Sequence, residues 1–313
     1  MSRKTIYTLA VNDYAPEICR LTFPLMRRYA KKIGADFFVI KDRKYPTLPP
    51  VYEKFQIFDL AKERGDEWSI YLDADVLVHP DFWDVTATLS KDMTLSGYRS
   101  DFTPQRFKLD EYFLRDGRFI GKGNWILVAS EWCRDIWHPL DDITPEEAIA
   151  RITPIEVETS TMVESGHLID DYLVSRNIAR YGLKHTLISD QMKEHNTPDP
   201  VNFLYHNYTI TENRKRAEMC QMIATWAGDV YSIRLPQGGF LPKPSIQGNT
   251  PEAVAANLIE RAQSLVDSWM GEKNIPGLKV QIMNPSAPVS STSTPLGGDS
   301  PYEIVDGKAE ATK

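Results

Sequence analysis

Short apolar runs alternate with helical patterns along the first half of the chain. Runs typical of buried strands occupy residues 5–10, 36–40 and 68–72. Between them, apolar side chains recur at helical spacing over residues 16–33 and 52–64, and a glycine follows each of these helices. This order predicts an α/β fold with a mostly parallel central sheet and helices on both of its faces.

The second half continues the pattern with less regularity. Further strands are expected over residues 93–98, 124–129 and 185–188. A helix is expected over residues 170–181, and a long amphipathic helix over residues 251–270. Between about residue 206 and the long helix, the alternation of strand and helix patterns fades. The pattern there predicts no particular order of helices and strands.

Composition divides the chain into three parts. Residues 1–215 carry the strand–helix alternation, and residues 216–284 are expected to extend the same domain with helices. Residues 285–313 are rich in Ser, Thr, Pro and Gly, and we expect them to form a disordered tail. Within the first part, Thr144 begins a predicted helix as its N-cap, and Glu147 occupies the position of a capping box.

Charge and cysteine content exclude several classes of protein. The 313 residues carry 36 Lys and Arg against 43 Asp and Glu, a net charge of −7, so we expect no nucleic-acid partner. The three cysteines lack CxxC spacing, which argues against a disulfide framework or a zinc cluster. No apolar run approaches the roughly 18 residues of a membrane-spanning helix. We therefore expect a cytoplasmic protein, located in a bacterial cytoplasm or, for a viral protein, in the cytosol of the host cell. Peripheral contact with a membrane stays compatible with the sequence.

Two carboxylates interrupt the apolar strand pattern around residue 73. Asp73 and Asp75 are separated by one residue, and alternate residues of an extended chain point to the same side. Two converging carboxylates in apolar surroundings are costly unless a cation lies between them. Oxygen ligands of this kind suit Mg²⁺ or Mn²⁺, and ligands of open α/β sheets bind beyond the carboxyl ends of the strands. The segment predicts a metal site, with a pair of solvated turn carboxylates as the alternative.

The segment 71–77, Tyr-Leu-Asp-Ala-Asp-Val-Leu, resembles the D-x-D motif of nucleotide-sugar glycosyltransferases with the GT-A fold. Other segments resemble that family in their order and spacing, and together they cover about residues 4–215. These segments are 10–14, 49–55, 123–128, 169–173 and 203–206. The resemblance implies a GT-A-like, Rossmann-like catalytic domain that moves a sugar from a nucleotide-diphosphate donor to an acceptor hydroxyl, with synthesis of a glycan as the expected role.

The resemblance also implies a metal centre. Mn²⁺ or Mg²⁺ would be held by Asp75, by Asp73 and by His206, and it would bridge the two phosphates of the donor. Stabilising the charge on the departing nucleoside diphosphate lowers the barrier to transfer. The chain departs from the family's pattern after His206, because the glycine expected there is missing.

Donor and acceptor contacts follow from the same resemblance. The base would stack on one aromatic ring and meet nearby backbone, the phosphates would meet a lysine, and the sugar would meet an asparagine. The acceptor is a glycan or another hydroxyl compound, a UDP-sugar is the favoured donor, and retention or inversion stays open. The implied donor contacts are Thr8, Ala10, Tyr14, Lys54, Asp73 and Asn124.

Several of these residues have a structural alternative. Asp170 and Asp171 are the candidates for the general base of an inverting reaction, and equally for first-turn carboxylates that favour a helix dipole. His206 could be a core histidine, Tyr14 could pack over the sheet edge, and Lys54 could lie on a solvated helix face.

Two rival functions fit the same motif. The haloacid-dehalogenase-type phosphatases also end an apolar strand in D-x-D, with Asp73 as the implied nucleophile and Asp75 as the acid/base. In those enzymes the motif normally lies on the first strand, whereas two predicted strands precede it here. A non-catalytic nucleotide-sugar binder on the same fold is the third possibility, since a fold does not determine a function.

Overall fold

The computed structural model describes most of the first 230 residues and one later helix. The described residues are 3–97, 108, 111–116, 124–152, 168–194, 204–206, 212–227, 233–234, 240–241 and 251–271. The tail expected over residues 285–313 lies outside them. Among the described residues, no helix is long and apolar enough to cross a membrane.

A six-stranded sheet forms the centre of the molecule, in the order β2-β1-β3-β6-β5-β7. β1 pairs in parallel with β2 and β3, and β5 pairs in parallel with β7. β6 runs antiparallel to both of its neighbours, so the expected mostly parallel sheet is confirmed with one reversed strand. The strands are β1 (Lys4–Leu9), β2 (Asp36–Ile40), β3 (Trp68–Leu72), β5 (Met93–Ser96), β6 (Ile126–Ser130) and β7 (Lys184–Leu187).

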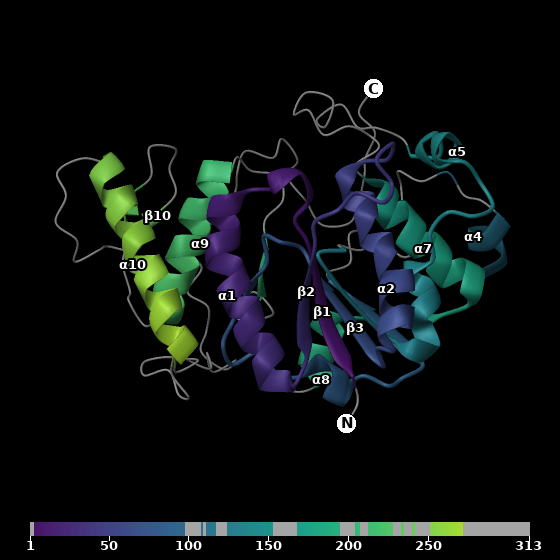
Figure 1. Cartoon of the computed structure of the whole chain (residues 1–313), viewed down its shortest axis with the longest axis horizontal. Coiled ribbons are helices and arrows are strands. Elements are labelled where there is room, and N and C mark those ends of the chain that lie inside the picture. Colours follow the sequence, from purple (N-terminus) through teal and green to yellow (C-terminus); the bar gives the residue numbers. More distant parts are fainter. Residues whose placement is uncertain are drawn as a thin grey trace, which may run out of the picture.

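Helices cover both faces of this sheet (Figure 1). Ile6 and Ile70 point to the face covered by α1 (Pro16–Ile33), whereas Tyr7 and Tyr71 point to the opposite face. This alternation follows from the period of two in a strand. The opposite face is covered by η2 (Pro50–Gln56), α2 (Ile57–Arg64), η4 (Glu131–Trp137) and α7 (Ile169–Tyr181).

A third apolar cluster lies on the outer side of α1. There α9 (Glu212–Trp226) and α10 (Pro251–Gly271) pack against α1 and against each other (Figure 1). Ile18, Leu21 and Leu25 of α1 are buried in this cluster, which also holds Met219, Ile223, Val266 and Trp269. The expected boundary at residue 215 therefore falls inside α9, whose buried side chains join the first and later parts of the chain.

Local signals explain where the main helices begin and end. Gly34, Gly65 and Gly182 follow α1, α2 and α7 with φ of 68°, 66° and 64°, the left-handed conformation that glycine adopts without a steric cost. α5 (Pro145–Ile149) carries the predicted capping box, since the Glu147 amide donates to the Thr144 hydroxyl and the Glu147 carboxylate accepts from the Thr144 amide.

Some expected bounds differ from the structure. The helix expected from residue 52 begins at Pro50 as a 3-10 helix, η2, and becomes α-helical at Ile57. The strand expected over residues 93–98 ends at Ser96, and the one expected over 124–129 begins at Ile126. The smaller elements are η1 (Val11–Asp13), β4 (Leu77–Val78), α3 (Val85–Thr88), α4 (Glu111–Asp116), α8 (Ile188–Glu194), β8 (Leu204–Tyr205), β9 (Ile233–Arg234) and β10 (Phe240–Leu241).

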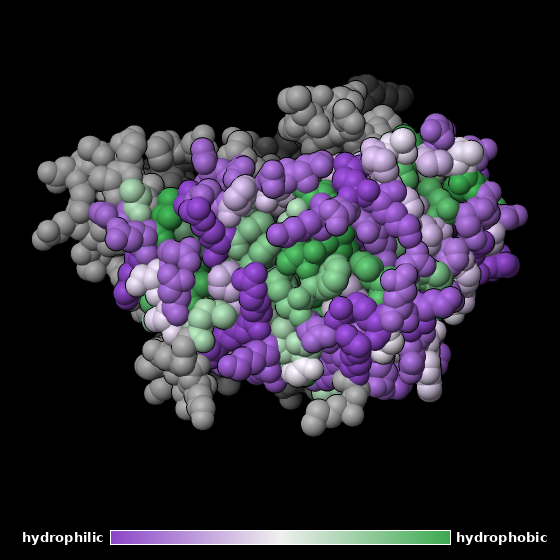
Figure 2. Space-filling model, in the orientation of Figure 1, coloured by the Kyte–Doolittle hydropathy of each residue, from purple (hydrophilic) through white to green (hydrophobic). Residues whose placement is uncertain are grey.

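The surface of the view in Figure 1 is polar over the helices and apolar between them. Figure 2 shows apolar surface in the middle of this face, over the region where Figure 1 places β1 and β2. Because β2 is an edge strand, Phe37 and Phe38 are only partly buried. The predicted metal site lies elsewhere, at the carboxyl edge of the sheet.

Candidate metal centre

The two aspartates of the motif lie in a turn that directly follows β3. The Asp73 amide donates to the Trp125 carbonyl at 2.9 Å, and the Val76 amide donates to the Asp73 carbonyl at 3.0 Å. The buried Thr22 hydroxyl of α1 donates to the Ala74 carbonyl at 2.6 Å. The turn is therefore fixed from both sides, by the residues before β6 and by α1.

His206 joins the two carboxylates across a long sequence separation. β8 pairs antiparallel with β4, which places Tyr205 opposite Leu77 and brings the next residue, His206, back to the turn. His206 Nε2 lies 3.4 Å from Asp75 Oδ1 and 3.7 Å from Asp73 Oδ2. The structure thus brings together the three side chains that the sequence predicts as metal ligands.

The donor set fits one divalent cation. The ligand atoms of Asp73, Asp75 and His206 all lie within 4.8 Å of one another. Octahedral ligands about 2.1 Å from a small divalent cation are at most about 4.2 Å apart, so small side-chain movements complete the set. Carboxylates are ligands of both Mg²⁺ and Mn²⁺, and an imidazole nitrogen favours a transition metal. The group could therefore hold a divalent metal ion.

Trp125 supports the imidazole from one side. Its ring stacks on the His206 ring, with the centroids 5.6 Å apart and the planes inclined by 16°. Trp125 is itself buried at the start of the chain segment that enters β6. The reversed direction of β6 is what brings a strand beginning, and hence Trp125, to the edge where β3 ends.

Asp75 is the most heavily engaged of the three candidate ligands. Its Oδ2 accepts a hydrogen bond from the Tyr14 hydroxyl at 3.1 Å and another from the ammonium of Lys215 on α9. Burial acts to raise the pKa of Asp75, but the hydrogen bond and charge of His206 and the charge of Lys215 outweigh it and hold that pKa below its usual range. Asp75 is thus ionised although only 5% of it is exposed.

Lys54 connects the motif to the start of α7. Its ammonium lies 2.5 Å from Asp170 Oδ2, 3.8 Å from Asp73 Oδ1 and 4.7 Å from the centre of the Tyr71 ring. Only 1% of Lys54 is exposed, so it is not the solvated helix-face lysine considered as the alternative. Burial acts to lower its pKa, but the charges of Asp170 and Asp73 raise it above the usual value, and Lys54 stays charged.

Tyr14 lies on a loop with unusual backbone geometry. Three non-glycine residues around it have positive φ: Asn12 at 55°, Asp13 at 53° and Ala15 at 38°. Such conformations cost about 1–3 kcal/mol each and occur where the surrounding structure holds them in place. Tyr14 is 42% exposed as a residue while its hydroxyl is bound to Asp75, so part of it faces solvent at the edge of the site.

Among the described residues, the buried polar atoms without a hydrogen-bond partner include those of two predicted donor contacts. They are Thr8, through its hydroxyl, and Asn124, through both atoms of its amide. Buried polar groups normally have partners, so each of these invites an explanation. The pairing of β1 with β3 ends at Tyr7, whereas its pairing with β2 continues through Thr8 to Leu9. Ala10 is held by the hydrogen bond of its amide to the Ile40 carbonyl at 2.9 Å.

Asp171 and His79 stand outside the three-ligand cluster. Asp171 is half-buried in the first turn of α7, beside Asp170. His79 is buried in a turn, where its Nδ1 accepts from the Asp81 amide at 2.9 Å and its ring contacts Trp226 at 4.9 Å. Burial lowers the pKa of His79 to about 4. His79 is therefore a structural, neutral histidine.

Two members of the site escaped the sequence analysis, Lys215 and Trp125. Lys215 lies in a region where the apolar pattern fades, and nothing in its neighbourhood marks it as a contact of Asp75. Trp125 is included in the segment 123–128, but the sequence does not reveal that its ring stacks on His206. Both contacts depend on tertiary structure alone.

Comparison with solved structures finds distant likenesses, one of them to a glycosyltransferase. No family model matches the chain, and no curated protein matches it. A solved structure described as "a glycosyltransferase involved in the glycosylation of the major capsid of PBCV-1" is similar with a TM-score of 0.40 and 12% identity. The match covers 69% of this chain and 98% of that chain. A likeness at this level identifies no family for this chain.

Proposed function

We propose that this chain is a metal-dependent glycosyltransferase that moves a sugar from a nucleotide-diphosphate donor, a UDP-sugar by preference, to an acceptor hydroxyl of a glycan. The observation that carries the proposal is the cluster of Asp73, Asp75 and His206 at the carboxyl edge of an α/β sheet. Ligands of open α/β sheets bind at this edge, and a diphosphate needs a cation to approach two carboxylates.

The metal ligands and the donor contacts would have separate tasks. Asp73, Asp75 and His206 would hold Mn²⁺ or Mg²⁺. The cation, when bound, supplies positive charge against the charge that develops on the departing diphosphate. Asn124 would offer its buried amide to sugar hydroxyls, which would satisfy the two atoms that have no partner within the described residues.

The nucleoside would bind beside β1. The partly exposed ring of Tyr14 offers a stacking surface for a base, and the backbone at Thr8 and Ala10 lies at the same end of β1. Lys54 would act through Asp73 and Asp170, which its ammonium already joins, so it would position carboxylates in addition to adding positive charge.

Proton acceptance would involve the start of α7. Lys54 engages Oδ2 of Asp170, so an acceptor hydroxyl would approach Oδ1 of Asp170 or the neighbouring Asp171. A general base must come within hydrogen-bond reach of the hydroxyl whose proton it removes. Asp170→Asn and Asp171→Asn, assayed separately, would identify the base, because only one of them is expected to abolish transfer while leaving donor binding unchanged.

The direct test is a thermal-shift screen of UDP- and GDP-sugars with and without Mn²⁺. We expect the correct donor to raise the melting temperature only with the metal, and to be hydrolysed slowly in the absence of an acceptor. Asp75→Asn should remove the metal-dependent shift. Asp42→Asn, which alters an exposed carboxylate outside the site, is the matched control and should keep it. A full shift in Asp75→Asn would contradict the proposal.

The same samples distinguish the rival functions. A phosphatase that used Asp73 as nucleophile would turn over an aryl phosphate with Mg²⁺ and would bind beryllofluoride. A non-catalytic binder would show the donor-dependent shift with neither hydrolysis nor transfer. The Tyr71 hydroxyl donates to Asp73 Oδ1 at 2.5 Å, and Lys54 lies 3.8 Å from the same oxygen, so a nucleophilic Asp73 would have to attack through Oδ2.

A further inference from the structure

The carboxylate of Asp75 already has protein partners on both of its oxygens. His206 lies next to Oδ1, and Oδ2 accepts from the Tyr14 hydroxyl and from the Lys215 ammonium. Asp75 and Lys215 are 5% and 6% exposed, so their ion pair is shielded from water. A cation bound to Oδ2 would have to share or replace these contacts.

Lys215 is brought to Asp75 by a packed helix. Met219 and Ile223, one and two turns further along α9, are fully buried in the cluster with α1 and α10. Because these side chains hold α9 in place, they also hold the Lys215 ammonium next to the Asp75 carboxylate. A buried lysine is costly without a partner, and the one that the structure provides is a predicted metal ligand.

We propose that Lys215 is a built-in counter-ion that competes with the divalent cation for Asp75. The inference rests on the metal site of the proposed function. The ammonium neutralises Asp75 in the absence of metal, and the cation gains Oδ2 only when the ammonium withdraws. A metal ion that binds without a donor must therefore displace the Lys215 ammonium. Lys215 lowers the affinity for the metal although it is not itself a metal ligand.

An ion pair that only stabilises the fold predicts a different change in metal affinity when Lys215 is replaced. If Lys215 only stabilised the fold, its removal would leave metal affinity unchanged or would weaken it by loosening α9. If Lys215 competes, its removal tightens metal binding because one repulsive charge and one competing hydrogen bond disappear together. The sign of the change in metal affinity separates the two.

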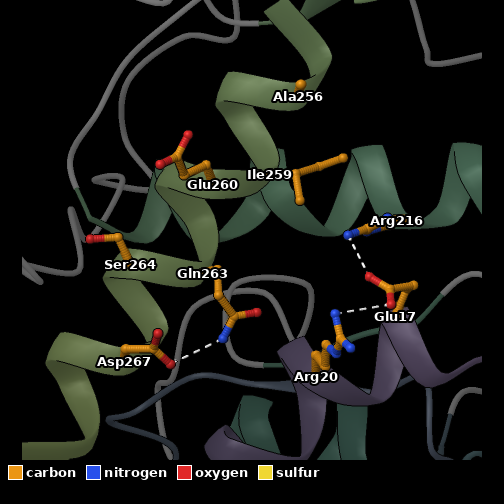
Figure 3. A pocket seen from close by; sticks show the side chains of 9 residues that line it. All are labelled: Glu17, Arg20, Arg216, Ala256, Ile259, Glu260, Gln263, Ser264 and Asp267. Atoms are coloured by element: carbon orange, nitrogen blue, oxygen red, sulfur yellow. Dashed lines mark hydrogen bonds and ion pairs between the residues drawn. The ribbon is translucent and has the colours of Figure 1, made fainter.

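The neighbouring residue on α9 offers a matched control. Arg216 points away from the metal site, into an open hollow of about 680 Å³ between α1, α9 and α10, where it pairs with Glu17 at 2.8 Å (Figure 3). Arg216→Met removes the same charge from the same turn of the helix without touching Asp75. It reports the effect of losing one positive charge from α9, together with the loss of the ion pair to Glu17.

The experiment measures Mn²⁺ binding to the full chain without any donor, by the electron paramagnetic resonance signal of free Mn²⁺. We expect Lys215→Met to bind Mn²⁺ about tenfold more tightly than the unaltered chain, the factor given by one charge-assisted hydrogen bond that no longer has to break. Arg216→Met should stay within about twofold, the size of a screened surface charge. Circular dichroism checks that each variant is folded.

Each outcome supports or overturns the inference. Equal or weaker Mn²⁺ binding by a folded Lys215→Met overturns it and leaves the proposed metal site intact. Equal tightening in both variants also overturns it, because net charge then explains the effect. No Mn²⁺ binding by any variant overturns the metal site and this inference together. If Lys215→Met does not fold, Lys215→Gln, which keeps an N–H donor without the charge, is measured with the same expectation.

Discussion

Replacing Lys54 with methionine tests the central ion pair of the site. Methionine keeps most of the side-chain length and apolar contact but removes the ammonium that lies 2.5 Å from Asp170 and 3.8 Å from Asp73. The two carboxylates would then lie close together in a largely buried region with no cation between them. We expect the folded state to lose stability, because buried like charges repel and are poorly hydrated.

The size of the loss follows from the burial of the three groups. Removing one partner of a fully buried pair costs about 3–5 kcal/mol. The Asp170 side chain is 11% exposed and the Asp73 side chain 28%, so water reaches both carboxylates to some degree. We therefore expect the lower end of that range, about 3 kcal/mol in the free energy of unfolding. Part of this loss of stability comes from the lost contact between the ammonium and the Tyr71 ring.

Urea unfolding at pH 7 measures this loss. Lys44→Met is the control, since Lys44 and Asp59 form an equally short but exposed pair, at 2.5 Å, whose removal should cost less than about 0.5 kcal/mol. The double variant Lys54→Met/Asp170→Asn should recover about half of the loss by removing one stranded charge. A free energy of unfolding for Lys54→Met within about 1 kcal/mol of the unaltered chain would refute the reasoning.

Three further predictions concern stability. Burial lowers the pKa of His79 from 6.5 to about 4, so the contribution of neutral His79 to the free energy of unfolding is complete above pH 6.5, and about 3 kcal/mol of it is lost as the pH falls to 4. In His79→Asn, whose side chain can still accept from the Asp81 amide, the free energy of unfolding in urea should depend less on pH over this range. Thr144→Ala should cost about 1 kcal/mol in urea unfolding by removing the capping-box hydroxyl, and an unchanged value would contradict the cap. Asn124→Ala should leave the melting temperature equal or higher, because its buried amide has no partner within the described residues, while weakening binding of the donor.

Much of the fold could be predicted because its signals are local. The bounds of α1, β2 and β3 agree with the apolar patterns over residues 16–33, 36–40 and 68–72. Strands buried on both faces appear as short apolar runs, and a glycine closes each helix between them. The direction of β6 could not be read in this way, because a buried strand has the same composition whichever way it runs.

In the candidate site, too, the residues marked by local sequence could be predicted, whereas the contacts that depend on tertiary packing could not. Asp73 and Asp75 were predictable as a pair of carboxylates at the end of an apolar strand, but they converge through the turn that follows β3 and not through the extended geometry that the sequence suggested. The partners of Asp75 were not, since Lys215 lies 140 positions away and contacts it only through the packing of α9 on α1. Lys54 shows a mixed case: its proximity to the motif was predicted, whereas its burial and its pairing with Asp170 depend on how η2 meets α7.

The double role of α1 has a consequence for biosynthesis. α1 is completed at Ile33, but the helices that cover its outer apolar side begin at Glu212, about 180 residues later. At about 5–20 residues per second, a ribosome needs roughly 10 to 35 s to make the intervening chain. During that interval Ile18, Leu21 and Leu25 lack the cover of α9 and α10 on the nascent chain, which makes this side of α1 a natural binding point for chaperones. Lys215 follows Asp75 by 140 residues, so Asp75 gains this charged partner only after the first turn of α9 has been synthesised.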